Sequence, residues 1–133
     1  MSFTVANSQA TLPGSVNANG LVGGNYISFE SKWAGFLRSS DGQIVTFAIG
    51  PGNTFFADLN NKSWVLGSYG DSSGVNHGFV RRPDGTISSF DDPDAGHDIS
   101  EGTQPSAINN LRYVTGYYYD SNRRYHGFLV HLR

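Results

Sequence analysis

Apolar and polar residues alternate over short stretches of the chain, which is the pattern of half-buried β-strands. Such stretches cover residues 63–69, 76–82 and 86–90, with a shorter one near 55–59. Turn residues separate them, and Asp84-Gly85 is a strong hairpin signal because glycine tolerates the positive φ of a tight turn. No run of apolar residues with helical spacing continues past its glycines. The pattern therefore predicts an all-β chain with almost no helix.

One phrase recurs three times along the chain. The segments GFLRSSDGQIVTF, GFVRRPDGTISSF and GFLVHLR begin at Gly35, Gly78 and Gly127. The Asn-rich segments before them place Asn17, Asn60 and Asn109 at the same two offsets, 43 and 49 residues. A period of roughly 40 to 50 residues in a strand-rich chain indicates stacked or radially arranged units. We therefore predict three tandem meander repeats of three to four strands each.

The repeats fill residues 1–133, which we expect to be a single domain. Repeat 1 covers about residues 17–59, repeat 2 about 60–108 and repeat 3 about 109–133. The third copy reaches Arg133 before its third strand, and MSFTV at the N-terminus aligns with the end of TISSFDD. Residues 1–16 are therefore expected to complete repeat 3, and the N-terminal strand to pair with the C-terminal one. Such closure, within one chain or between chains, hides edges that would recruit foreign strands.

The shared pattern resembles the HAF repeat, a bacterial tandem repeat named for His-Ala-Phe and often labelled extracellular. The tripeptide reads His77-Gly78-Phe79 and His126-Gly127-Phe128 here, whereas the first copy has Ala34-Gly35-Phe36. The resemblance covers essentially the whole chain. It implies a β-propeller-like arrangement with one repeat per blade, and it implies no enzymatic activity.

Three repeats leave open how a ring would close, because propellers need at least about four blades. Two chains can combine into a six-bladed ring whose terminal strands cross between protomers. Alternatively, three repeats close a smaller threefold fold such as a β-prism or a β-trefoil. The family resemblance favours the propeller, and closed symmetric oligomers are common. The expected partner is therefore a second copy of the chain, in a homodimer.

The charge balance argues against one class of partner. Nine basic and eleven acidic residues give a net charge of -2, and the charges are interleaved along the chain. This is not the composition of a polyanion-binding protein, so no nucleic-acid partner is expected. No apolar run approaches a membrane span, and the first residues lack the regions of a signal peptide, so we expect neither in this chain. Apart from the resemblance, the sequence leaves the cellular location open.

Aromatic residues near strand ends and loops suggest a carbohydrate surface. An amphipathic ring there stacks on the apolar face of a sugar while polar side chains bind its hydroxyls. Repetition would join several weak sites on a multivalent glycan. Trp33, Tyr119 and Tyr125 are expected to be exposed, whereas Trp64 is expected in the core. The candidate ligand-binding residues are Trp33, Tyr119, Tyr125, His77, His126, Asp71 and Asp120.

A structural role competes with binding at the His and Asp positions. His77 and Phe79 share one strand face, and the more ordinary interpretation is that the His fixes a turn while the Phe ring packs. Asp71 and Asp120 lie in turns, where Asp usually caps backbone amides. The His positions lack companion metal ligands, so neither a metal site nor a cofactor is predicted. The acidic loop 91–101 departs from the regular calcium-loop pattern, and calcium binding there stays open.

The sequence offers no catalytic motif. No phosphate loop, nucleophile elbow or metalloprotease helix is present, so no catalytic residues are assigned and no enzymatic activity is predicted. We expect a non-catalytic recognition module, lectin-like in its repeated aromatic and polar clusters. The alternative is a structural self-assembly module whose conspicuous residues are buried between units. A carbohydrate-active enzyme is the weakest of the three hypotheses.

Overall fold

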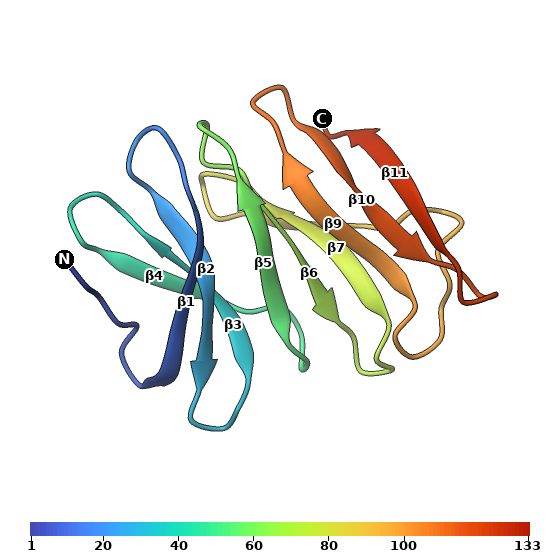
Figure 1. Cartoon of the computed structure of the whole chain (residues 1–133), viewed down its shortest axis with the longest axis horizontal. Helices are drawn as coiled ribbons and strands as arrows, with labels where there is room; N and C mark the ends of the chain where they lie inside the picture. Colours follow the sequence, from blue (N-terminus) through green and yellow to red (C-terminus); the bar gives the residue numbers. More distant parts are fainter.

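The computed structural model describes residues 1–133 and contains eleven β-strands and no helix. The predicted all-β class is therefore confirmed. The strands form antiparallel meanders that lie side by side along the long axis of the molecule (Figure 1). With no helix present, none is available to span a membrane.

The strands fall into three units of similar topology. Unit 1 contains β1 (Ser8–Val16), β2 (Val22–Ser28), β3 (Trp33–Arg38) and β4 (Ile44–Phe47). Unit 2 contains β5 (Thr54–Leu59), β6 (Val65–Gly70), β7 (Asn76–Arg81) and β8 (Ile87–Phe90). Unit 3 contains β9 (Gly102–Ile108), β10 (Tyr113–Tyr119) and β11 (Tyr125–His131). Neighbouring strands within each unit pair in sequence order, which confirms the predicted meanders of three to four strands.

Units 2 and 3 share one parallel strand-pairing bridge. Asn76 of β7 pairs with Gly102 of β9, and this bridge joins the two meanders into one seven-stranded sheet. Unit 1 remains a separate four-stranded sheet. The sheets are not closed into a barrel, so each end of the row presents a free surface (Figure 1).

The sheets begin one strand earlier than the sequence repeats. Residues 8–16, expected to complete repeat 3, form β1 and pair with β2 of unit 1 instead. Residues 1–7 belong to no strand, and β11 pairs only with β10. The predicted pairing of the N-terminal with the C-terminal strand is therefore absent within one chain. Figure 1 shows the reason, because the N-terminus and β11 lie at opposite ends of the row of units.

The hydrophobic core lies between units. Leu37 of unit 1 packs with Leu59 and Val65 of unit 2 in one cluster. Leu66 of unit 2 packs with Ile108 and Val114 of unit 3 in the other. Leu59 and Ile108 are repeat equivalents, as are Val65 and Val114, so two of the three core positions are the same at both interfaces between units. Each unit thus buries its apolar surface mainly against its neighbour, as in other repeat proteins.

A phenylalanine pair lies at each of the two interfaces between units, and a third pair joins the N-terminal segment to unit 1. The Phe ring at the end of the outer strand of one unit meets, edge to face, the Phe of the Gly-Phe motif in the next unit; Phe79 there is buried and Phe128 is half-buried. Aromatic rings favour this geometry because the positive edge of one ring faces the negative face of the other. The pairs are Phe47 with Phe79, Phe90 with Phe128, and Phe3 with Phe36, at centroid distances of 5.9, 6.4 and 5.8 Å.

Candidate functional site

Four of the candidate residues predicted from the sequence form two clusters, one in unit 2 and one in unit 3. The His77 cluster consists of His77, Tyr69, Asp71 and Asp91. His77 Nε2 lies 2.9 Å from Asp71 Oδ2, and His77 Nδ1 lies 3.0 and 2.9 Å from the two carboxylate oxygens of Asp91. The Tyr69 ring lies beside the imidazole, with 5.3 Å between centroids. Both ring nitrogens therefore face a carboxylate.

Asp71 connects this cluster to the turn between β6 and β7. Its Oδ1 accepts hydrogen bonds from the backbone N–H groups of Ser73 (2.8 Å) and Val75 (3.1 Å), while Oδ2 faces His77. One carboxylate thus caps the turn and orients the imidazole. This is the structural role expected for an Asp in a turn and a His beside a packed Phe.

The His126 cluster consists of His126, Tyr118 and Asp120, and it lacks a counterpart of Asp91. His126 Nε2 lies 2.7 Å from Asp120 Oδ2, and Asp120 Oδ1 accepts from the backbone of Asn122 and Arg124 at 2.9 Å each. The Tyr118 ring stacks on the imidazole at 4.9 Å between centroids. No carboxylate faces His126 Nδ1, because Asp91 follows the outer strand of unit 2 and unit 3 has no outer strand. Unit 1 has Ser28 and Ala34 at the equivalent positions and forms no such cluster.

Two carboxylates decide the ionisation of His77. Partial burial of the ring lowers its pKa, but the hydrogen bonds to Asp71 and Asp91 and their negative charges outweigh burial and raise the pKa of His77 above its ordinary value. The hydrogen bond from His77, followed by the Val75 amide, lowers the pKa of Asp71. The amide of Arg124, followed by His126, lowers the pKa of Asp120. A protonated His77 can donate from both nitrogens, which is why the folded state favours it.

This arrangement predicts a pH-dependent contribution to stability. Because the folded-state pKa of His77 is raised, its contribution is complete below the pKa of the unfolded chain and is lost as the pH rises through the folded-state value. Urea unfolding should show a larger stability difference between wild type and His77→Asn at about pH 5.5 than at about pH 8.5. His97→Asn is the matched control, since that exposed side chain makes no hydrogen bond. A difference that is constant or grows with pH would contradict this prediction.

The remaining candidates lie outside the two clusters. Trp33 was expected to be exposed but is half-buried, because its ring packs against Phe55 of unit 2 at 5.6 Å between centroids. Tyr125 is 71% exposed as expected, whereas Tyr119 is half-buried, because the Tyr125 ring packs 4.5 Å from it; the Tyr117 ring lies 5.5 Å from Tyr125. The structure therefore does not reproduce one equivalent aromatic and polar cluster in each repeat.

Trp64 is half-buried at the joint between units 2 and 3. It packs against the cluster that contains Leu66, in keeping with the expected core role. Arg82 and Arg112 place their guanidinium groups over its ring at 5.3 and 5.2 Å. Such contacts are favourable because the ring face is negative.

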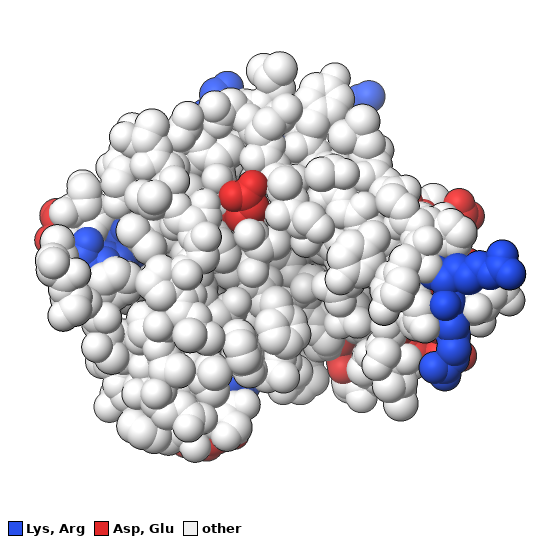
Figure 2. All heavy atoms as spheres, viewed as in Figure 1, with Lys and Arg blue, Asp and Glu red and all other residues white.

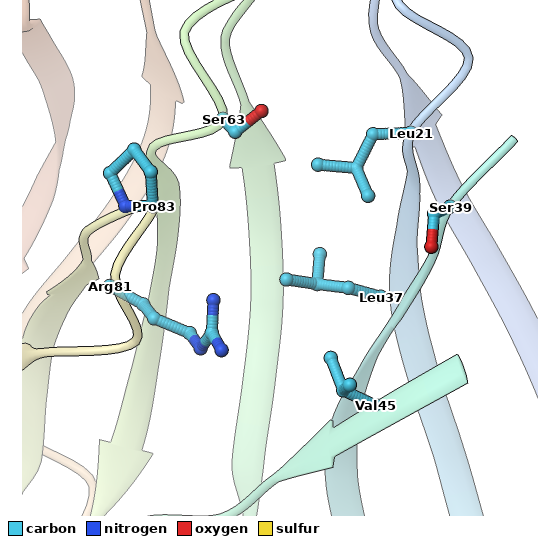
Figure 3. A pocket seen from close by; sticks show the side chains of 7 residues that line it. All are labelled: Leu21, Leu37, Ser39, Val45, Ser63, Arg81 and Pro83. Atoms are coloured by element: carbon cyan, nitrogen blue, oxygen red, sulfur yellow. The ribbon is translucent and has the colours of Figure 1, made fainter. Parts of the chain in front are cut away.

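A groove of about 370 Å³ lies between units 1 and 2. Figure 3 shows Leu21 and Leu37 facing Arg81 across it, with Val45 at one side. Arg81 is the one ionisable residue in the lining, and its guanidinium lies over the Phe47 ring at 5.7 Å. The groove holds no acid and base pair, and both His clusters lie outside it.

Acidic side chains in the loop 91–101 bind the loop's own backbone. Asp92 Oδ1 accepts from Asp94 N at 2.9 Å, and the buried Glu101 accepts through Oε2 from Asp98 N at 3.0 Å. No three His, Cys, Asp or Glu side chains gather into a group suited to a metal ion. On the face shown in Figure 2, charged side chains are sparse and scattered, and most of the surface is formed by other residues.

The two ends of the row expose apolar side chains that the sequence analysis did not single out. Leu129 at the free face of unit 3 is 72% exposed, whereas its repeat equivalents Leu37 and Val80 are buried. Val16 at the free face of unit 1 is 64% exposed, whereas its equivalents Leu59 and Ile108 are buried. The offsets of 43 and 49 residues identify these residues as repeat equivalents, but only the structure shows which of them are exposed. We call these surfaces the unit 3 end face and the unit 1 end face.

Comparison of the chain with protein-family models, with curated proteins and with solved structures finds no match.

Proposed function

We propose that this chain is a non-catalytic assembly module that works by associating through its two end faces. The observation that carries the proposal is the exposure of Leu129 and Val16, whose repeat equivalents are all buried between units. Apolar side chains that are exposed to water, at positions that are buried at the interfaces between the other units, favour a partner that covers them.

The unit architecture supports a β-propeller as the assembled form. Each complete unit is a four-stranded antiparallel meander, which is the composition of a propeller blade. The units follow one another with equivalent apolar clusters and phenylalanine pairs, as successive blades do. The resemblance to the HAF repeat carries the same expectation. In this proposal the row of units is an arc of a ring, and the end faces are where the ring is completed.

The native mass in solution tests this function. We expect light scattering to give a multiple of the 14.4 kDa chain mass over a concentration series. Leu129→Asp should shift the mass toward that of the single chain, because it places a charge where the apolar contact forms. Ile99→Asp is the matched control, since Ile99 has the same exposed fraction of 72% and lies in the loop 91–101. A mass of 14.4 kDa at every concentration would refute assembly.

Glycan recognition is the second candidate, and one observation favours it. The exposed Tyr125 and Tyr117 pack around the half-buried Tyr119 on β10 and β11, and this aromatic surface suits stacking on a sugar. Tyr125 and Tyr117 belong to the unit 3 end face, so assembly and glycan binding compete for them. The same mass measurement separates the two functions, because a chain that remains single keeps this surface available.

A further inference from the structure

We propose that a second copy of this chain supplies the missing outer strand of unit 3. Residues 1–5 of one copy lie antiparallel along β11 of the other copy, with Phe3 opposite Gly127, and two copies close a six-bladed ring. The inference rests on the proposed assembly function and adds the identity of the partner and the register of the joint.

The outer strand of a unit is its last strand, β4 in unit 1 and β8 in unit 2. Residues 1–5 make the same contacts to unit 1 that the ends of these strands make to the next unit. Phe3 packs on Phe36 as Phe47 packs on Phe79 and Phe90 on Phe128. The residue two places after each outer Phe donates its backbone N–H to a threonine hydroxyl on the first strand of the next unit. These bonds join Val5 to Thr11, Ile49 to Thr54 and Asp92 to Thr103, at 3.0, 2.9 and 2.9 Å. The N-terminal segment thus has the position of the outer strand of a unit preceding unit 1.

Unit 3 has a free slot for that strand. In units 1 and 2 the outer Phe pairs with the glycine of the Gly-Phe motif, Phe47 with Gly35 and Phe90 with Gly78. The Phe ring covers the glycine so closely that a Cβ at Gly78 would lie 2.8 Å from Phe90 Cζ. At Gly127 the nearest atom to such a Cβ is Gly116 O at 3.9 Å, so the surface above Gly127 is open. Phe3 of a second copy fits this slot by repeat equivalence.

The same register gives His126 a partner. In unit 2, Asp91 follows the outer Phe by one residue and lies 2.9 Å from His77 Nδ1. Thr4 follows Phe3 by one residue, so this register places the Thr4 hydroxyl of the second copy at His126 Nδ1. That nitrogen has no hydrogen-bond partner within the chain. The joint therefore completes the His126 cluster with a neutral group.

A row of asparagines runs across the joints and is unfinished at both ends. Asn17 Nδ2 donates to Asn60 O at 3.1 Å, and Asn60 Nδ2 donates to Asn109 O at 3.0 Å. Asn109 Nδ2 has no acceptor in the chain, while Asn17 O accepts only from Gly20 N. Placing a second copy as the next unit lets Asn109 donate to its Asn17. Asn61 N also donates to Asn110 Oδ1 between units 2 and 3. This bond has no counterpart between the two copies, because Ala18 is the residue equivalent to Asn61 and Asn110.

The two end faces are also complementary in their apolar residues. Leu37 packs on Leu59 at the first joint, and the equivalent residues at the proposed joint are Leu129 and Val16. Together Leu129, Thr115 and Ile108 line a groove of about 220 Å³ that Val16 of the second copy would enter. Burying both exposed side chains supplies the driving force for the joint.

Tyrosines on the unit 3 end face have matching neighbours on the unit 1 end face. Trp33 packs on Phe55, and the equivalents of this pair are Tyr125 and the exposed Leu12. Asn25 accepts a hydrogen bond from Phe56 N, and the equivalents of that pair are Tyr117 and Pro13. Proline has no N–H to donate, so an aromatic ring suits the position facing it better than an amide does.

The number of units favours two copies. Propellers have typically about four to eight blades, and six is the one multiple of three in that range. The joint is heterologous, because the unit 3 end face of each copy meets the unit 1 end face of the other. Heterologous joints close into rings when the rotation allows it and otherwise extend into open filaments.

Engineered cysteines test the register directly, because the natural chain has none. Thr4→Cys combined with His126→Cys should give a disulfide-linked dimer on mild oxidation, resolved on a non-reducing denaturing gel. Both positions are exposed in the single chain, so the substitutions leave its fold intact. Thr4→Cys with Tyr125→Cys is the matched control, since adjacent strand residues point to opposite faces. That control should link far less.

A second variant tests the Phe3 slot without cysteine chemistry. Gly127→Val fills the open space above Gly127 and fits the single chain, because only Gly116 O approaches a Cβ there. Loss of Phe3 burial should raise the dissociation constant of the dimer by about 10- to 100-fold. The fold is checked by the unchanged circular dichroism of the diluted chain.

The outcomes separate this inference from the assembly function. Native oligomers that neither form the Thr4→Cys/His126→Cys link nor respond to Gly127→Val would overturn the strand exchange and leave assembly through other contacts. A disulfide within a single chain would overturn the second copy as the partner. A covalent ladder or trimer would overturn the six-bladed ring. A 14.4 kDa wild-type chain at all concentrations would overturn both proposals.

Discussion

Replacing Phe79 by alanine is expected to lower the free energy of unfolding by about 3–5 kcal/mol. The Phe79 side chain is fully buried, and its ring packs edge to face on Phe47 of the preceding unit. Gly67 lies beneath the ring, where a Cβ would come within 2.5 Å of Phe79 Cε1. Neither neighbour can fill the cavity, since Gly67 has no side chain and Phe47 is held over Gly35. Chemical denaturation followed by tryptophan fluorescence measures the loss.

Phe29→Ala is the matched control for that substitution. Phe29 lies in the turn after β2 and is 70% exposed, so the same chemical change should cost less than about 0.5 kcal/mol. Equal losses for the two variants, or a loss below about 1 kcal/mol for Phe79→Ala, would show that the joint between units 1 and 2 does not carry the stability of the fold.

Replacing Asn25 by alanine should cost about 2–4 kcal/mol, although the residue is polar. The buried Asn25 side chain makes three hydrogen bonds, one within unit 1 and two that join units 1 and 2. Nδ2 donates to Ala34 O at 2.9 Å and to Thr54 O at 2.8 Å, and Oδ1 accepts from Phe56 N at 3.0 Å. Alanine leaves the Phe56 N–H without its acceptor at the interface between units 1 and 2, and that unpaired donor accounts for much of the loss.

The repeat provides a control for Asn25. Ser68 is the equivalent residue of unit 2 and makes one side-chain bond across the next joint, to Gln104 Oε1 at 3.1 Å. Ser68→Ala should therefore cost only about 1 kcal/mol in the same denaturation experiment. A smaller loss for Asn25→Ala than for Ser68→Ala would contradict the assignment of Asn25 as the main polar link between units 1 and 2.

Local features of the fold were predictable from the sequence. The strands expected at residues 76–82 and 86–90 are found at Asn76–Arg81 and Ile87–Phe90, because alternation and Asp-Gly turns act over a few neighbouring residues. The capping by Asp71 was also predictable, since its partners Ser73 and Val75 are within four residues. Repetition then extended each local prediction to the equivalent positions of the other units.

The candidate site was predictable only in part. His77 and Asp71 meet across a single turn, so their contact follows from short-range geometry. Asp91 reaches His77 from 14 residues away through the pairing of β7 with the end of β8, and periodicity alone does not specify that contact. The predicted exposure of Trp33 was wrong for the same reason. Phe55 of the next unit packs against the Trp33 ring, and no residue near Trp33 in the sequence indicates this contact.

The sequence by itself determined the number of repeats, the strand and turn positions within them, and the equivalence of Phe3 to the outer-strand phenylalanines. Only the tertiary structure decided which strand opens each sheet, which apolar positions are buried, and which remain exposed at the two end faces. Leu37 and Leu129 occupy the same repeat position, yet one is buried and the other is exposed. The physical reason is that burial depends on having a neighbouring unit, and Leu129 has none within the chain.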